Sequence, residues 1–80
     1  MTERLSVDDR DRAINLTQVL KLAGWVMNGG EAKALIAEGR IRVNGVVESR
    51  KRRKMTVGDR VEMDGGPSLI LVGNSPLPDD

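Results

Sequence analysis

A helical period of apolar positions begins at Leu16. Four apolar residues recur at i, i+3, i+4 and i+7, which places them on one face of a helix: Leu16, Val19, Leu20 and Ala23. Gly24 follows the last of them, at the position where a residue of left-handed conformation commonly ends a helix. The pattern therefore predicts a first helix from Leu16, with Trp25 folded back over its end as part of the core.

A second helix is predicted in the stretch NGGEAKALIAEG. Asn28 is a favourable N-cap residue, and Glu31 stands three residues later, in the capping-box position. Three apolar residues form the stripe of this helix: Ala32, Leu35 and Ile36. Gly39 is placed to end it. Because only a short loop separates the two helices, we expect their apolar stripes to pack against each other.

The apolar period changes from 3.6 to 2 in the stretch RIRVNGVV. The Asn-Gly pair at 44–45 is the strongest short-range hairpin signal, because both residues tolerate positive φ. A two-residue turn would place Val43 opposite Val46 and Arg42 opposite Val47. The sequence therefore predicts a tight hairpin directly after the second helix.

Two more strands are predicted after a Gly-Asp turn at 58–59. Val61 and Met63 alternate with polar residues, and the stretch SLILV reads as the last strand. The expected fold class is therefore α+β, with two short packed helices followed by a small antiparallel β-sheet, over residues 16–72. The charged segment 1–15 is expected to be a flexible N-terminal arm, and 73–80 a disordered acidic tail.

The composition narrows the functions that such a domain supports. The chain has 80 residues, enough for one small domain, and contains neither Cys nor His. It therefore lacks thiolate metal ligands, disulfides and the commonest general base. We expect no cofactor, no metal and no catalysis. No apolar stretch has the length of a membrane span and no secretion signal opens the chain, so we expect a cytoplasmic protein.

The net charge of +1 conceals an uneven distribution. Residues 1–15 hold three basic and four acidic side chains, and residues 58–80 hold one basic and five acidic side chains. The middle of the chain, residues 16–57, holds nine basic and three acidic side chains, a net charge of +6. An asymmetry of this kind indicates a face that binds a polyanion.

Five basic residues run together without an acidic break in the stretch SRKRRKMTVGD: Arg50, Lys51, Arg52, Arg53 and Lys54. The run could be a solvated loop, a localisation signal, a membrane-surface patch or a contact with nucleic acid. A membrane-surface segment would carry large apolar residues on an amphipathic helix, which this stretch lacks. Repeated phosphate contacts suit these side chains better, so we favour nucleic acid.

The start of the second helix is a further candidate site for an anion. Gly29 and Gly30 leave backbone N–H groups uncovered, and the helix dipole favours an anion there. A Gly-Gly pair is also common in ordinary loops, so this signal is weak taken alone. Lys33 adds a charge one turn later, and Arg40 and Arg42 alternate with apolar residues of the first hairpin strand. We expect these three side chains and the helix start to line one concave surface.

Several spaced residues together resemble the S4-type RNA-binding domain, also called the alpha-L motif. The stretches LTQVLKLAGWVMNGGEAKALIAEGRIRVNGVVE and VGDRV carry the resemblance, over about residues 16–63, and they are most similar to the small stand-alone bacterial members, the YbcJ-like proteins. The resemblance implies two packed helices beside a small sheet, and binding to structured RNA. The family commonly has Ser then Arg where this chain has Asn28 and Gly29. The Arg contact is therefore missing, and Lys33 matches a position that is often basic.

We therefore predict a non-catalytic, monomeric protein that binds structured RNA, above all ribosomal RNA or a ribosomal particle. The preference for RNA over DNA rests on the resemblance. Lys33, Arg40 and Arg42 would form the central contact, and the run at 50–54 a peripheral arm. The full candidate set is Asn28, Gly29, Gly30, Lys33, Arg40, Arg42, Asn44, Arg50, Lys51, Arg52, Arg53 and Lys54. The alternatives are a protein-interaction module or an accessory factor, with the basic patch bound to an acidic protein partner.

Overall fold

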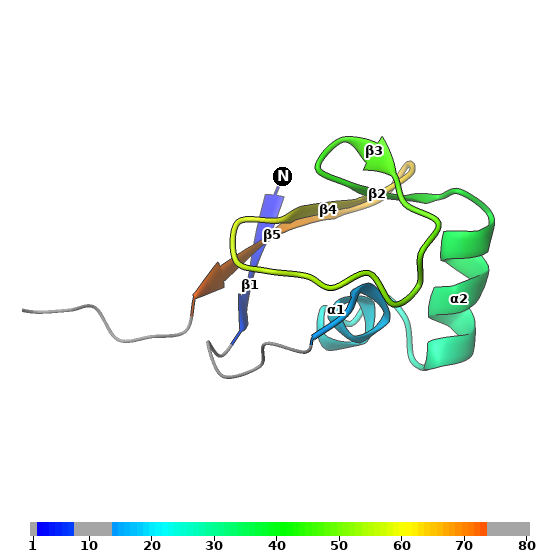
Figure 1. The fold of residues 1–80 in the computed structure, drawn as a ribbon, viewed down its shortest axis with the longest axis horizontal. Coiled ribbons are helices and arrows are strands. Elements are labelled where there is room, and N and C mark those ends of the chain that lie inside the picture. The colour runs from blue at the N-terminus through cyan, green and yellow to red at the C-terminus, as the bar shows by residue number, and fades with distance from the viewer. Residues whose placement is uncertain (1, 8–13, 74–80) are drawn as a thin grey trace, which may run out of the picture.

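The computed structural model describes residues 2–7 and 14–73 of the chain. These residues form two helices and five strands: β1 (Thr2–Val7), α1 (Leu16–Leu22), α2 (Gly29–Ala37), β2 (Ile41–Val43), β3 (Val46–Val47), β4 (Arg60–Met63) and β5 (Ser68–Gly73). The strands form one sheet in the order β1-β5-β4-β2-β3. Both helices pack on the same side of this sheet, and the described residues place no helix on its other side (Figure 1). The predicted α+β class is confirmed.

Most of the sheet is antiparallel, as predicted. β2 pairs with both β3 and β4, and β4 pairs with β5, all in antiparallel orientation. In the hairpin, Val43 lies opposite Val46 and Arg42 opposite Val47, which confirms the predicted register. Asn44 and Gly45 have φ values of 54° and 86°. Both turn residues are therefore left-handed, which matches the twist of the strands that they join.

Each helix begins at an asparagine cap. In α2, the Asn28 side chain accepts a hydrogen bond from the Glu31 N–H at 2.9 Å, as predicted, but the Glu31 carboxylate accepts from the Met27 N–H, not from Asn28. In α1, Asn15 and Gln18 form a complete reciprocal capping box, with distances of 2.8 and 2.9 Å. The start of α1 at Leu16 is thus defined by two side-chain hydrogen bonds.

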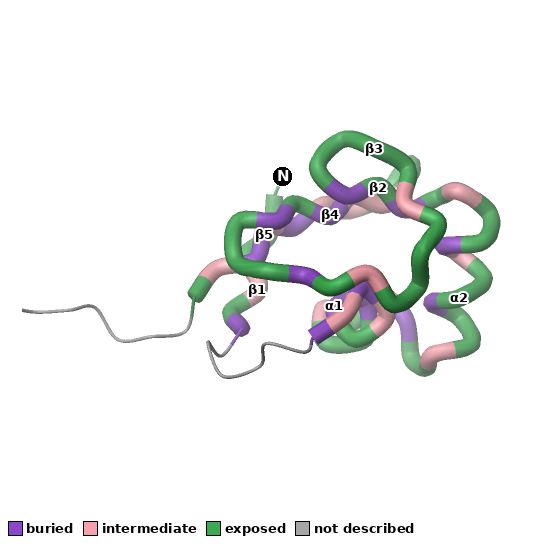
Figure 2. The backbone as a smooth tube through the Cα atoms, in the orientation of Figure 1, coloured by how far each residue is buried: buried purple, intermediate pink, exposed green. Residues whose placement is uncertain are grey.

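The hydrophobic core lies between the helices and one face of the sheet (Figure 2). Its largest fully buried side chains come from α1 and from three of the strands: Leu16, Val19, Leu20, Ile41, Val61, Leu69 and Leu71. Trp25 is half-buried and packs against this core, which is the position that the sequence indicated. The two helices contact each other, as their apolar stripes predicted.

The prediction of a flexible arm over residues 1–15 is wrong for Thr2–Val7, which form β1. β1 pairs in parallel with β5, and Leu5 and Val7 pack into the core. Gly73, which was assigned to the predicted tail, is the last residue of β5. These segments are ordered because each supplies the other with a partner strand. The prediction of a flexible arm is also wrong for Ile14, which is buried in the core, and for Asn15, which caps α1. Residues 1, 8–13 and 74–80 of the two predicted segments lie outside the described residues.

Candidate nucleic-acid interface

The basic run is fixed over the start of α1. The first N–H groups of a helix have no partner within the helix. Here the Leu16 N–H donates to the Arg53 carbonyl at 2.9 Å, and the Thr17 N–H donates to the Lys51 carbonyl at 3.3 Å. The Thr17 hydroxyl donates to the same Lys51 carbonyl at 2.8 Å. The backbone of the run, predicted as a peripheral arm, is therefore held by the helix start.

Two of the five basic side chains of the run form internal ion pairs. Glu48 accepts from Arg50 through both carboxylate oxygens, at 3.0 and 3.1 Å, and its Oε1 lies 3.0 Å from Arg53 Nε. Arg53 also reaches Asp59, with its Nη1 3.4 Å from Oδ2. The side chain of Glu48 is only 12% exposed, and that of Arg53 is 24% exposed. We call these four residues the arginine clasp.

The arginine clasp shifts the ionisation of its central carboxylate. The side-chain hydrogen bond from Arg50 lowers the pKa of Glu48 from 4.5 to about 2, helped by the backbone N–H of Arg50 and the charges of both arginines, while burial opposes the change. The same hydrogen bond raises the pKa of the Arg50 guanidinium. Arg50 and Arg53 thus stabilise the loop, and their charges are largely neutralised by Glu48 and Asp59.

The other three side chains of the run carry unpaired charge. Lys51, Arg52 and Lys54 are exposed, and none of them forms an ion pair with any residue that the structure describes. We call them the free loop cations. Figure 2 shows the loop between β3 and β4 as mostly exposed, with its half-buried and buried parts where it passes α1. The loop therefore presents three exposed cationic side chains from a backbone that is held in place.

The start of α2 lies beside this loop. A Cβ atom at Gly29 would stand 3.9 Å from the Thr17 methyl group, and Thr17 is the residue that binds the Lys51 carbonyl. Lys33 follows Gly29 by four residues, so both lie on the same side of α2. Lys33 is exposed and has no ion pair among the described residues. The fold thus places the side of α2 that carries Gly29 and Lys33 toward the loop of the free loop cations.

The anion site expected at Gly29 and Gly30 already faces a carboxylate. Glu31 stands in the first turn of α2, where a negative charge is favourable, and it accepts from the Met27 N–H at 2.6 Å. Asn28 accepts the Glu31 N–H. A phosphate at this helix start would therefore meet the charge of Glu31, so the geometry supports a weaker anion site than the Gly-Gly pair suggested.

Arg40 and Arg42 do not share one surface with Lys33 and the helix start. α2 rises about 12 Å over its nine residues, and Arg40 follows its opposite end, where Nη1 lies 3.8 Å from Glu38. Arg42 is exposed between Ile41 and Val43, which are both buried toward the helices. Side chains alternate along a strand, so Arg42 stands on the face of the sheet away from the helices. The expected single concave surface is a wrong prediction.

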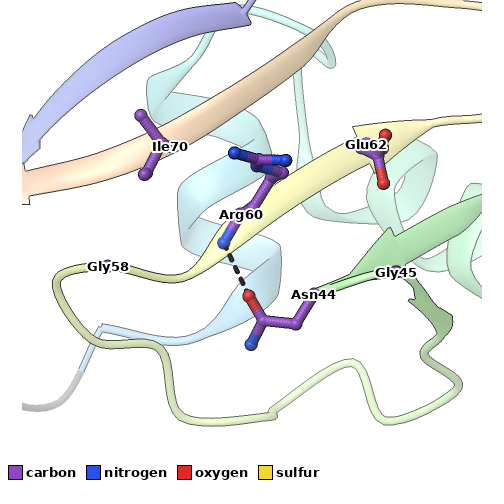
Figure 3. A pocket seen from close by; sticks show the side chains of 6 residues that line it. All are labelled: Asn44, Gly45, Gly58, Arg60, Glu62 and Ile70. Carbon is purple, nitrogen blue, oxygen red and sulfur yellow. Dashed lines mark hydrogen bonds between the residues drawn. The ribbon is translucent and has the colours of Figure 1, made fainter.

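Both polar atoms of the Asn44 side chain form hydrogen bonds. Its Nδ2 donates to Asp59 at 3.1 Å. Its Oδ1 accepts from the Arg60 N–H at 3.0 Å, as Figure 3 shows. Asp59 also accepts from the Thr56 N–H at 2.9 Å. The Asn44 side chain thus connects the hairpin to the start of β4. Sequence reasoning placed Asn44 in the RNA-binding set, and it missed Thr17, Glu48 and Asp59 as residues that fix the loop.

The described residues, 2–7 and 14–73, contain no cluster of His, Cys, Asp or Glu that could hold a metal ion. Neither of the two helices in these ranges is long and apolar enough to cross a membrane.

Comparison with known proteins gives consistent results. A family model described as the S4 domain matches residues 7–71. YbcJ of Escherichia coli, named as an RNA-binding protein, is 46% identical over 52 residues, which are 65% of this chain and 74% of YbcJ. RlbA of Bacillus subtilis, named as a ribosome maturation protein, is 39% identical over 72 residues, which are 90% of this chain and 99% of RlbA. The solution structure of E. coli YbcJ, described as revealing an alpha-L motif involved in RNA binding, superposes with a TM-score of 0.68 at 38% identity, covering 90% of this chain and 89% of YbcJ.

Proposed function

The chain belongs to the S4 domain family, and we propose that it binds structured RNA, without catalysis, through the free loop cations and Lys33. The observation that carries this proposal is the fixed backbone of the basic run. Hydrogen bonds from Leu16 and Thr17 hold it, and the arginine clasp uses two charges while Lys51, Arg52 and Lys54 stay free. Such an arrangement suits repeated phosphate contacts.

RNA recognised by shape is the best match for these side chains. Single-strand binders stack bases on exposed aromatic rings, whereas the one aromatic residue of this chain, Trp25, packs against the core. Phosphate contacts spaced over a rigid surface suit a folded RNA. The names of the E. coli and B. subtilis relatives support RNA, and ribosomal RNA or a maturing ribosomal particle, as the target. A target of that kind implies a cytoplasmic protein.

The test is binding of the purified chain to ribosomal RNA fragments and to duplex DNA of matched length, across a salt series. Four phosphate contacts would give a slope of log affinity against log salt of about −4, with the duplex-DNA coefficient as a guide. The variant Lys51→Ala/Arg52→Ala/Lys54→Ala should lower RNA affinity and bring the slope to about −1. A matched variant, Lys51→Arg/Arg52→Lys/Lys54→Arg, keeps every charge and should bind as the parent does.

Two results would contradict the proposal. Equal affinity of the parent and the alanine variant would exclude the free loop cations as the contact. Failure of the parent to bind either nucleic acid at low salt, together with a stable complex with an acidic protein, would favour a protein-interaction module instead.

A further inference from the structure

The face of the sheet away from the helices carries three arginines from three different strands. Arg4 of β1, Arg42 of β2 and Arg60 of β4 all alternate with side chains that point into the core. All three are exposed, and none forms an ion pair with a residue in the described ranges. We call this surface the open sheet face. Its arginines lie opposite the layer that holds the free loop cations.

The strand register sets the spacing of these charges. Ile70 of β5 pairs with Arg4 on one side and with Arg60 on the other, so the two arginines are two strands apart, about 10 Å. Arg42 pairs with Glu62, which is two residues from Arg60 along β4. Arg42 and Arg60 are therefore diagonal neighbours, about 7–8 Å apart. Glu62 is the acidic residue that lies beside two of these arginines, opposite Arg42 and two residues from Arg60.

A shallow hollow lies on the open sheet face where β4 begins beside the turn of the hairpin. It has a volume of about 340 Å³ and is lined by Asn44, Gly45, Gly58, Arg60, Glu62 and Ile70. Figure 3 shows Arg60 and Ile70 standing on the side of the sheet that faces away from α1. Two of the lining residues are glycines, which let a ligand approach the backbone closely. The guanidinium group of Arg60 beside an accessible backbone is a suitable partner for a phosphate group.

We infer that the open sheet face is a second contact for the phosphate backbone of RNA, so that one chain holds two RNA segments on opposite sides. This inference rests on the proposed function. Arginine binds phosphate through two parallel N–H donors, and the three arginines of this face have no ion pair among the described residues. A protein partner would need a continuous apolar centre, whereas Ile70 is flanked by Arg4 and Arg60 in its row.

The experiment measures bridging of two RNAs. A biotinylated RNA hairpin is fixed on beads, and capture of a second, fluorescent hairpin by the protein is recorded, beside binding of a single hairpin in solution. The open-face variant is Arg4→Gln/Arg42→Gln/Arg60→Gln, and the loop variant is the alanine triple above. Glu62→Gln is the matched control on the same face, because it removes the carboxylate that lies beside Arg42 and Arg60.

Capture of the second RNA should fall about tenfold or more in the open-face variant, because three phosphate contacts are lost. Binding of a single hairpin should remain, with the salt slope of the loop contact. The Glu62→Gln variant should capture more of the second RNA than the parent. The single variants Arg4→Gln and Arg42→Gln should each show part of the loss, and they replace the triple variant if circular dichroism shows that it does not fold.

Unchanged capture in the open-face variant would overturn the inference while the proposed function stands. Loss of single-hairpin binding by the parent itself would overturn both. A variant that keeps RNA capture but loses binding to poly-glutamate would assign this face to an acidic protein, which also overturns the inference. The inference would also be overturned if sedimentation showed that the parent bridges two RNAs as a dimer and that the open-face variant is a monomer.

Discussion

Replacing Glu48 with Gln should destabilise the protein at neutral pH and much less in acid. The difference between a pKa of 4.5 and one of about 2 corresponds to at most about 3 kcal/mol. Arg50 is 71% exposed, so water screens the main partner of this carboxylate. We therefore expect Glu48→Gln to lower the free energy of unfolding by about 1–2 kcal/mol at pH 7.

The sign of the pH dependence follows from the direction of the shift. The pKa of Glu48 is lower in the folded chain, so its contribution is present above pH 4.5 and is lost as the pH falls toward about 2. Urea unfolding of the parent and of Glu48→Gln, measured between pH 7 and pH 2.5, should give free energies that converge at the acid end. The matched control is Glu38→Gln, because Glu38 is 60% exposed and 3.8 Å from Arg40. It should change stability by less than about 0.5 kcal/mol.

Two outcomes would refute this reasoning. If Glu48→Gln were as stable as the parent at pH 7, the ion pairs of the arginine clasp would contribute nothing. If the two proteins differed by the same amount at every pH, the loss would come from packing and not from the charge of Glu48.

Three further changes test the contacts around the loop. Asn15→Ala should lower the free energy of unfolding by about 1 kcal/mol in urea titrations, because the capping box of α1 is lost. Thr17→Val removes the hydroxyl bound to the Lys51 carbonyl and should cost about 1 kcal/mol. Amide hydrogen exchange in the loop should also become faster. Glu31→Gln removes the carboxylate at the start of α2 and should raise RNA affinity in anisotropy titrations, whereas Glu3→Gln, at the far strand β1, should leave it unchanged.

The features that the sequence predicted correctly depend on residues close together in the chain. The hairpin at 44–45 follows from two residues that accept positive φ, and the start of α2 follows from the cap at Asn28. The end of α2 follows in the same way from Gly39, which has a φ of 73°. Local backbone preference decides each of these features, so no distant contact was needed to predict them.

β1 could not be predicted in this way, because its stability comes from the far end of the chain. Thr2 lies opposite Ser68, and only Leu5 and Val7 of the segment pack into the core. Two apolar positions among charged neighbours give too short an alternation to indicate a strand. Such a strand forms only after β5 offers its free edge, which is a contact of high sequence separation.

The sequence showed which basic residues the chain carries, but not how the fold arranges them. The alternation of polar and apolar residues showed that Arg42 and its apolar neighbours lie on opposite faces of a strand. Which of these two faces meets the helices is decided by tertiary packing. The roles inside the basic run were also hidden, because Glu48 and Asp59 flank it from outside and select Arg50 and Arg53 as partners. Charge alone did not distinguish the residues that hold the loop from those that are free.

In the basic run, some side chains hold the loop and others remain free, and this difference affects the affinity expected for RNA. Ordering a flexible cationic loop on RNA would cost conformational entropy for every residue that is fixed. Here the Leu16 and Thr17 N–H groups and the arginine clasp have already fixed the backbone in the free protein. Only the side chains of Lys51, Arg52 and Lys54 remain to be ordered on binding. In the proposed RNA contact, two of the five charges of the run are thus used within the protein, and the other three would bind RNA at a lower entropic cost.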